Sequence, residues 1–184
     1  MNNKYQISEN LCINKYLIIK HVENAVNIVK KIILDLYESN PKNKFIHYFD
    51  AKKIMENLRS DSKDYTFLDK LKHKTGAYIF LYENKPLYIG VGGIKNKDDL
   101  KTRVKNECKI YGETKEKSAT LSKNIQDIET ALGNTDKVKH HEKLMKKFQI
   151  VAIALGDMSI KNNQQLAIIL ETILISLFHP KYNK

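Results

Sequence analysis

A single carboxylate lies within an apolar stretch near the end of the 184-residue chain. The residues from Leu166 to Phe178 are apolar around nearly the whole of a predicted helix, and Glu171 is the only charged residue among them. We therefore expect a central, buried helix. Burying a lone carboxylate is costly unless a cation, a metal ion or hydrogen bonds offset the cost. Glu171 either opens into a functional site or forms a structural ion pair with a lysine.

A second candidate for chemistry is one of the two arginines of the chain. Of 32 basic residues, only Arg59 and Arg103 are arginines, so lysine serves nearly every ordinary cationic position. Arginine differs from lysine in its planar fork, which can bind a phosphate through two parallel hydrogen bonds. Arg103 lies in a predicted helix over residues 98–107, where Asp98 and Asp99 suit the N-terminus. It is either a phosphate ligand or a surface arginine whose stem covers a hydrophobic edge.

Residues 76–93 predict a β-hairpin that carries two tyrosines. Two β-forming runs, AYIFLY and PLYIGVG, flank a polar turn at Glu83-Asn84-Lys85. Four of the seven glycines of the chain lie at its two ends: Gly76, Gly90, Gly92 and Gly93. Glycine at these positions is expected to permit positive φ angles and the close approach of a ligand to the backbone. Tyr78 and Tyr88 lie on neighbouring strands, where each either packs at the edge of the core or belongs to a site.

The hairpin and the residues after it resemble the GIY-YIG nuclease family. Gly76-Ala77-Tyr78 corresponds to the first half of the family signature, with Ala where Ile is usual, and Tyr88-Ile89-Gly90 matches the second half. Arg103 stands where the family carries its helical arginine, and Glu171 where it carries a glutamate on the last core helix. Asn183, after His179-Pro180, resembles the asparagine that follows that glutamate. The resemblance covers about residues 74–184.

The resemblance implies a metal-dependent endonuclease that leaves 5′-phosphate and 3′-hydroxyl ends. Glu171 would bind one Mg²⁺ or Mn²⁺ ion per active site, and Arg103 would hold the scissile phosphate. Tyr78 resembles the family tyrosine proposed as general base, Tyr88 would orient water or phosphate, and Asn183 would close the site. An unperturbed phenol has a pKa of about 10, so Tyr78 would need a lowered pKa to act as the base.

The chain departs from the family pattern at Glu107, one helical turn after Arg103. Several family members carry a histidine or a tyrosine at this place. Glu107 either accepts a proton in that relay or pairs with Arg103 and weakens its grip on phosphate. The identity of the general base therefore stays open.

The net charge of +11 indicates a polyanionic partner. Double-stranded DNA fits better than a membrane surface, because the chain has no signal peptide, anchor motif or apolar run of bilayer length. Cys12 and Cys108 are far apart, which favours a reducing compartment and a cytoplasmic location. Six lysines are expected to contact phosphate, although a solvated helical face gives a similar pattern: Lys101, Lys105, Lys115, Lys117, Lys123 and Lys139.

These elements predict an α+β fold with a small three-stranded sheet flanked by helices. The third strand is expected over residues 148–155, buried on both faces. Two lysine-rich helices, over residues 117–132 and 135–147, form an insertion at about residues 112–147. The nuclease core would then comprise residues 74–184.

Residues 1–73 are predicted as an N-terminal helical accessory region. A long amphipathic helix is expected over residues 15–38 and a short helix over residues 51–59. The apolar stripe of the long helix either packs on the core or forms the seam of a homodimer.

Among nucleases of this family, the chain is most like a small type II restriction endonuclease. It has no room for the partner-binding domains of a repair subunit, nor for the linker and DNA-binding tail of a homing endonuclease. A homodimer would cut both strands of a palindrome. The alternatives are a repair or mobile-element nuclease and a non-catalytic nucleic-acid-binding module with the same fold.

Overall fold

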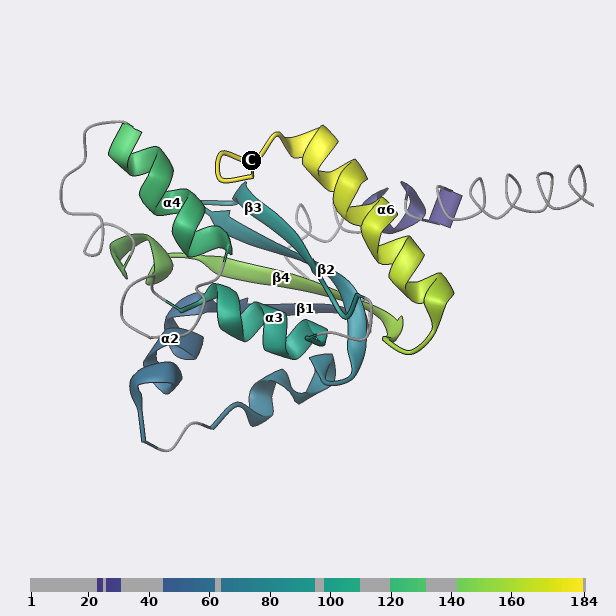
Figure 1. The fold of residues 1–184 in the computed structure, drawn as a ribbon, viewed down its shortest axis with the longest axis horizontal. Helices are drawn as coiled ribbons and strands as arrows, with labels where there is room; N and C mark the ends of the chain where they lie inside the picture. Colours follow the sequence, from purple (N-terminus) through teal and green to yellow (C-terminus); the bar gives the residue numbers. More distant parts are fainter. Residues whose placement is uncertain are drawn as a thin grey trace, which may run out of the picture.

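The computed structural model describes residues 23–24, 26–30, 45–61, 64–94, 98–109, 120–131 and 142–183. Its elements follow in chain order (Figure 1): β1 (Ile46–Asp50), α2 (Ala51–Arg59), the 3₁₀ helix η1 (Thr66–Leu71), β2 (Lys74–Tyr82), β3 (Lys85–Gly92), α3 (Leu100–Glu107), α4 (Thr120–Ala131), β4 (Gln149–Asp157) and α6 (Lys161–Phe178). Residues 142–145 add a helical turn before β4. None of the helices within these described ranges has both the length and the apolar character needed to cross a membrane.

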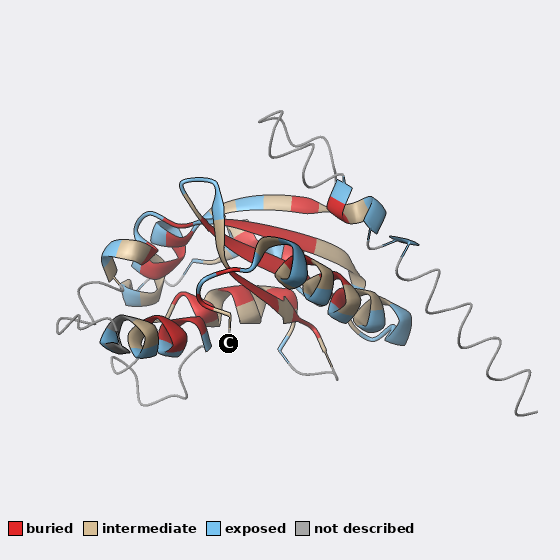
Figure 2. Ribbon diagram, turned by 90° about the horizontal axis from the view of Figure 1, so that it is seen from above, coloured by how far each residue is buried: buried red, intermediate tan, exposed pale blue. Residues whose placement is uncertain are grey.

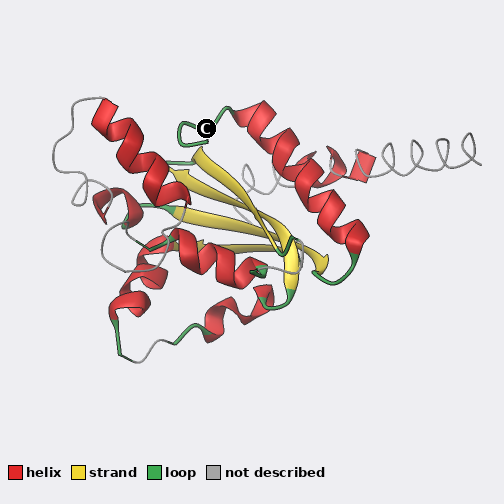
Figure 3. Ribbon diagram, in the orientation of Figure 1, coloured by secondary structure: helices red, strands yellow, loops and turns green. Residues whose placement is uncertain are grey.

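The sheet is antiparallel, with strand order β1-β4-β2-β3 and helices on both sides (Figure 3). The prediction of an α+β protein is confirmed, but the sheet has four strands rather than three. The additional strand, β1, pairs with β4 from Ile46 opposite Ile153 to Asp50 opposite Gln149. It is a short edge strand in which only Ile46 is buried, so its sequence carries a weak hydrophobic signal.

The predicted hairpin is confirmed as β2 and β3. Its turn is formed by Glu83 and Asn84, whose φ angles are 49° and 61°. Positive φ at both central residues is what the twist of a two-residue hairpin requires, and asparagine tolerates it well. The resulting register places Tyr78 opposite Gly90 and Phe80 opposite Tyr88.

Two hydrophobic clusters cover the two faces of the sheet (Figure 2). Helices α2, α3 and α4 and the 3₁₀ helix η1 pack on the face that carries Tyr78 and Phe80, whereas α6 packs on the face that carries Ala77 and Ile79. Because successive strand residues point to opposite faces, β4 contributes alternately to the two clusters. The prediction that this strand is buried on both faces is confirmed.

Helix α6 is only partly buried, which corrects the expectation of a central helix buried all round. Its buried side consists of Ala167, Leu170 and Leu174, while Ile168 and Leu177 on the other side are 43% and 50% exposed. The helix forms an outer layer on one face of the sheet, and a helix in an outer layer buries one side only.

Residues 45–61 and 64–73 share the sheet and core of the later elements. Strand β1 hydrogen-bonds with β4, and Ile54 and Met55 of α2 lie in the same cluster as Tyr78. The region predicted to be helical therefore contributes a strand as well as α2, whose bounds match the predicted helix over residues 51–59.

Two predicted helices lie partly outside the described residues. Within the helix expected over residues 15–38, residues 23–24 and 26–30 are helical, and Val29 is buried against the cluster beneath α6. Helix α4 falls within the predicted range 117–132, and of the helix predicted over residues 135–147 the structure describes the turn at residues 142–145.

Candidate active site

A buried carboxylate, Glu107, lies at the centre of a hydrogen-bonded cluster. Its side chain is 0% exposed. Oε1 accepts a hydrogen bond from Tyr78 Oη at 3.0 Å and lies 3.0 Å from an Arg103 guanidinium nitrogen. Oε2 accepts from the backbone N–H of Leu121 at 2.8 Å. These donors offset the cost of burying the charge, and they join β2, α3 and the first turn of α4 at one point.

Helix α3 holds Arg103 and Glu107 in place. Its N-cap is Asp99, which accepts hydrogen bonds from the backbone N–H groups of Thr102 at 2.8 Å and His73 at 2.7 Å. The predicted role of Asp99 at the helix N-terminus is therefore confirmed. Leu100 turns inward, and Arg103 and Glu107, four residues apart, lie on one side of the helix where their side chains can pair.

Gly90 and Gly92 allow the tyrosine ring and α3 to lie against β3. A Cβ atom at Gly90 would stand 2.4 Å from Tyr78 Oη, and one at Gly92 would stand 2.9 Å from the Cα atom of Leu100 and 3.1 Å from Arg103 Cβ. Protein atoms thus occupy the space that the sequence suggested for a ligand. Of the hairpin glycines, only Gly93 has a positive φ angle, 73°.

Tyr78 and Tyr88 lie side by side beneath this cluster, with ring centroids 6.2 Å apart. They are 0% and 5% exposed. Burial, reinforced by the charge of Glu107, raises the pKa of the Tyr78 phenol well above its ordinary value and raises the pKa of Tyr88 as well. This direction is opposite to the lowered pKa expected for Tyr78 as general base. Both tyrosines are neutral phenols, and Tyr88 is hydrogen-bonded to Tyr78 and to Thr120.

Glu171 is a half-buried carboxylate on α6. Burial raises its pKa from 4.5 to about 7, and the nearby charge of Arg103 partly opposes that shift. Among the described residues, no lysine forms an ion pair with it and no donor forms a hydrogen bond to it.

Arg103 connects Glu171 to the buried cluster. Its guanidinium pairs with Glu107, and it lies close enough to Glu171 to lower the pKa of that carboxyl. The two helices that carry these groups, α3 and α6, lie on opposite faces of the sheet and both pack against β3 (Figure 1). The structure thus places Arg103 in contact with Glu107 beside the two phenols, and near enough to Glu171 to influence its pKa.

Asn183 binds the backbone of β3. Its Oδ1 accepts from the N–H of Ile89 at 2.8 Å, and its Nδ2 donates to the carbonyl oxygen of Ile89 at 2.7 Å. The backbone N–H of Tyr182 donates to the carbonyl of Leu87 at 2.8 Å. The chain after α6 therefore lies along the outer edge of β3, and Asn183 supports the strand that carries Tyr88.

The lysines predicted to contact phosphate differ in their surroundings. Lys101 forms an ion pair with Asp69 at 2.6 Å, and the ammonium group of Lys105 lies 5.2 Å from the centroid of the Tyr65 ring. Lys123 is exposed on α4. The remaining three lie outside the described residues: Lys115, Lys117 and Lys139.

A metal ion at this site would have a single protein carboxylate. Within the described part of the chain, no group of three or more His, Cys, Asp or Glu side chains could hold a metal ion. Mg²⁺ is commonly bound through one or two carboxylates and keeps several water ligands. Glu171 fits such a site because its carboxylate is half-buried and has no protein donor among the described residues.

The sequence did not predict two groups that lie in the hydrogen-bonded cluster around Glu107. The backbone N–H of Leu121 and the side chain of Thr120 begin α4, and both reach the buried polar groups. A backbone donor has no residue type that could signal it, and Thr120 is not unusual at the start of a helix.

The chain matches the model of no known protein family, and no curated protein or solved structure is detectably similar to it. The GIY-YIG resemblance therefore depends on the motif residues and on their positions in the fold.

Proposed function

We propose that the chain is a metal-dependent DNA endonuclease that hydrolyses phosphodiester bonds and leaves 5′-phosphate and 3′-hydroxyl ends. One observation carries the proposal: the Arg103 guanidinium pairs with a buried carboxylate, Glu107, beside two buried phenols, and is near enough to the half-buried Glu171 to influence the pKa of that carboxyl. An arginine that is still one third exposed, near a half-buried carboxylate with a raised pKa, suits a site that must accept a phosphate and a metal ion.

Arg103 is the phosphate ligand in this proposal. Its pairing with Glu107 fixes the orientation of the guanidinium plane, and its side chain is 33% exposed. A guanidinium has several N–H donors in a rigid fork, so donors remain for a phosphate oxygen after Glu107 is satisfied. Glu107 therefore orients Arg103 rather than neutralising its function.

Glu171 is the residue that would hold Mg²⁺ or Mn²⁺. The ion, when bound, supplies charge stabilisation for the leaving 3′ oxygen. The raised pKa of about 7 means that Glu171 is largely ionised, and competent to bind a cation, only above neutral pH when no cation is present.

The proton of the attacking water passes through the tyrosines to Glu107. Tyr88 is the more exposed phenol, its ring lies 6.2 Å from that of Tyr78, and Tyr78 donates to Glu107 Oε1 at 3.0 Å. A neutral phenol can accept one proton from water while it gives its own to the next acceptor. Burial raises the pKa of Glu107, which favours its role as the final acceptor.

The test is cleavage of supercoiled plasmid in Mg²⁺ by the parent chain and three variants. Glu171→Gln should abolish cutting and retain DNA binding, and Arg103→Lys should slow cutting by about 100-fold, because a lysine lacks the fork. Arg59→Lys is the matched control: Arg59 pairs with Glu142 and lies on α2, so this variant should cut at the parental rate.

The outcomes separate the alternatives. Equal cutting by Glu171→Gln would remove that residue from the site. Binding without cutting, across metals and substrates, would favour a non-catalytic binding module. Discrete fragments would identify a site-specific enzyme of the restriction type, as a homodimer on a palindrome would give, whereas a smear would identify a nonspecific one.

A further inference from the structure

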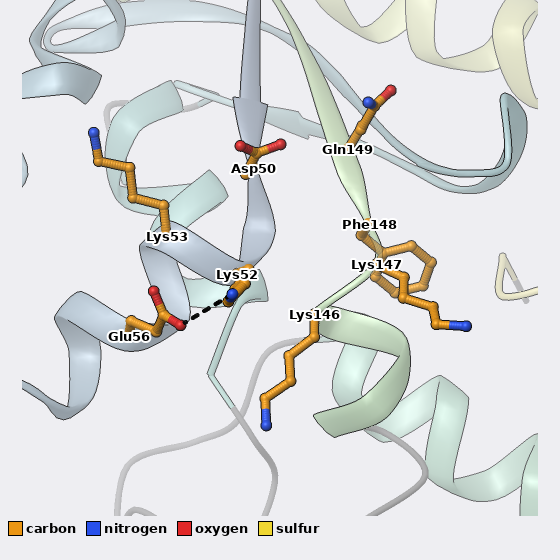
Figure 4. Close-up of a pocket in the computed structure, with 8 residues that line it drawn as sticks. All are labelled: Asp50, Lys52, Lys53, Glu56, Lys146, Lys147, Phe148 and Gln149. Carbon is orange, nitrogen blue, oxygen red and sulfur yellow. Dashed lines mark ion pairs between the residues drawn. The ribbon is translucent and has the colours of Figure 1, made fainter.

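A hollow of about 420 Å³ lies where β1 ends and β4 begins (Figure 4). Four lysines line it, two from the first turn of α2 and two from the residues before β4: Lys52, Lys53, Lys146 and Lys147. The carboxylates of Asp50 and Glu56 also belong to its wall. The lining therefore has a net charge of 4 − 2 = +2. The hollow borders the hydrophobic cluster that contains Tyr78, because Phe148 belongs both to its lining and to that cluster.

Two of these lysines are held in place by aromatic rings. The ammonium group of Lys53 lies 4.4 Å from the centroid of Phe67. That of Lys147 lies 5.6 Å from the centroid of Tyr82. A ring attracts a cation without cancelling its charge, so both ammonium groups stay positive and positioned.

The other two lysines form exposed ion pairs that a ligand can replace. Lys52 lies 3.8 Å from Glu56, and both side chains are more than half exposed, while Lys146 lies 2.8 Å from Glu142. Exposed ion pairs contribute little to the stability of a protein, and salt weakens them further. A phosphate can therefore compete for these ammonium groups at little cost.

We infer that this hollow binds the phosphate backbone of the DNA at a distance from the bond that is cut. The inference rests on the proposed function. The hollow lies at the end of β4 where Gln149 pairs with Leu81, whereas Arg103 lies beside Gly92, whose partner Gly76 pairs with Ala154. Two strand spacings across the sheet and several residues along it separate them by roughly 15–20 Å, or about five base pairs of a duplex. Because the four ammonium groups come from two segments and point in different directions (Figure 4), the hollow suits a polyanion that engages several cations better than it suits a single free phosphate.

The test compares a double variant, Lys52→Gln/Lys146→Gln, with a matched control, Lys85→Gln/Lys161→Gln. Both double variants lower the net charge equally, and both control lysines are exposed and lie outside the hollow. Binding to a short blunt-ended duplex is measured by fluorescence anisotropy over a NaCl series, in the Glu171→Gln background and without added metal. The association constant K falls as the salt concentration rises, so a plot of log K against log [NaCl] has a negative slope. Loss of two phosphate contacts should make this slope shallower by about 1.8 and weaken binding about tenfold at low salt. The control double variant should show a smaller effect.

Each outcome decides the inference. Equal affinities and slopes for the two double variants overturn it, and if the parent chain still cuts plasmid, the proposed function survives that failure. A parent chain that binds no duplex overturns both. A final experiment measures binding to vesicles of phosphatidylcholine and phosphatidylserine. The inference is overturned if the parent chain binds these vesicles more tightly than the duplex and the Lys52→Gln/Lys146→Gln variant loses that binding. The hollow would then be assigned to a membrane surface.

Discussion

Glu107 and Glu171 are two carboxylates with different surroundings, and the difference separates their proposed roles. Glu107 is fully buried but surrounded by donors from three elements, so it is part of the fixed structure of the site. Glu171 is half-buried and has no such donors among the described residues, so its proposed role is to bind a metal ion. Pairs of acids whose environments differ in this way commonly divide catalytic roles between them.

Replacing Glu171 by glutamine should stabilise the protein at alkaline pH. The folded-state pKa of about 7 lies above the ordinary value of 4.5. The unfolded chain therefore binds fewer protons between these values, and the free energy of unfolding of the parent falls as pH rises through this window. Because the side chain is partly exposed, we reduce the full conversion of 1.36 kcal/mol per pKa unit to a gain of about 1–2 kcal/mol for Glu171→Gln.

Urea denaturation without metal at about pH 4 and about pH 8 measures this gain. The free energy of unfolding of the Glu171→Gln variant should exceed that of the parent at the higher pH and equal it at the lower pH. Glu56→Gln, which replaces an exposed carboxylate, is the control and should show no such pH-dependent gain. A Glu171→Gln variant that is less stable than the parent at alkaline pH would show that Glu171 is a structural ion-pair partner.

Replacing Glu107 by glutamine should slow cleavage more than it destabilises the fold. The amide keeps an acceptor oxygen but loses the charge that pairs with Arg103 and accepts the proton of Tyr78. We expect a loss of about 2 kcal/mol in the free energy of unfolding and a fall of at least about 100-fold in the cleavage rate. Single-turnover cleavage rates as a function of pH and urea denaturation measure the two effects.

Tyr78→Phe is the matched comparison, because it removes the donor to Glu107 Oε1 and leaves the pair with Arg103. It should also slow cleavage, while phosphate binding persists. If Glu107→Gln cut plasmid at the parental rate, Glu107 would be excluded from the proton path.

At the scale of elements, the β3 edge depends on the segment that follows α6. The side-chain amide of Asn183 hydrogen-bonds both backbone groups of Ile89, in place of a neighbouring strand. Asn183→Ala should therefore lower the free energy of unfolding by about 1–2 kcal/mol and speed amide exchange at Ile89. Hydrogen exchange measured by NMR resolves that amide directly.

Asn183→Asp is the informative control, since a carboxylate keeps the acceptor for the Ile89 N–H but loses the donor to the Ile89 carbonyl. Protection of the Ile89 amide should be intermediate in this variant. Unchanged exchange at Ile89 in Asn183→Ala would refute the role of Asn183 as a support for β3.

Elements with a local signal were predictable, and those that depend on distant pairing were not. The hairpin follows from two β-forming runs around a turn that residues such as Asn84 tolerate, and α3 follows from its Asp99 cap. Strand β1 exists because β4, about a hundred residues later in the chain, lies beside it. The burial of only one side of α6 was not predictable either, because an apolar sequence does not show whether other elements cover one side of the helix or both.

The same distinction applies to the site. The residue types of Arg103 and Glu171 stood out because each is rare in its surroundings. The contact between Tyr78 and Glu107 depends on the packing of α3 against the sheet, and the direction of the Tyr78 pKa depends on its burial. Both depend on the three-dimensional arrangement, which cannot be deduced from the spacing of residues along the chain.

At the scale of the whole molecule, one sheet separates two hydrophobic clusters and both depend on β4. Alternate residues of this strand, such as Ala152 and Ile153, belong to opposite clusters. Strand β1 and α2, from the N-terminal region, are built onto the same sheet and core. We therefore expect residues 45–183 to unfold in one cooperative transition rather than as an accessory region and a core.

Alanine substitutions on the two faces test this cooperativity. Ile54 of α2 and Ile153 of β4 are each 0% exposed, in different clusters, so Ile54→Ala and Ile153→Ala should each cost about 2–5 kcal/mol. Both should shift the same single urea transition, with far-UV circular dichroism and tyrosine fluorescence giving coincident curves. Ile160→Ala, at a residue that is 50% exposed, is the control and should change the midpoint little. An early partial transition in Ile54→Ala, with the remaining transition unshifted, would show that the N-terminal region folds separately from the sheet that carries the candidate site.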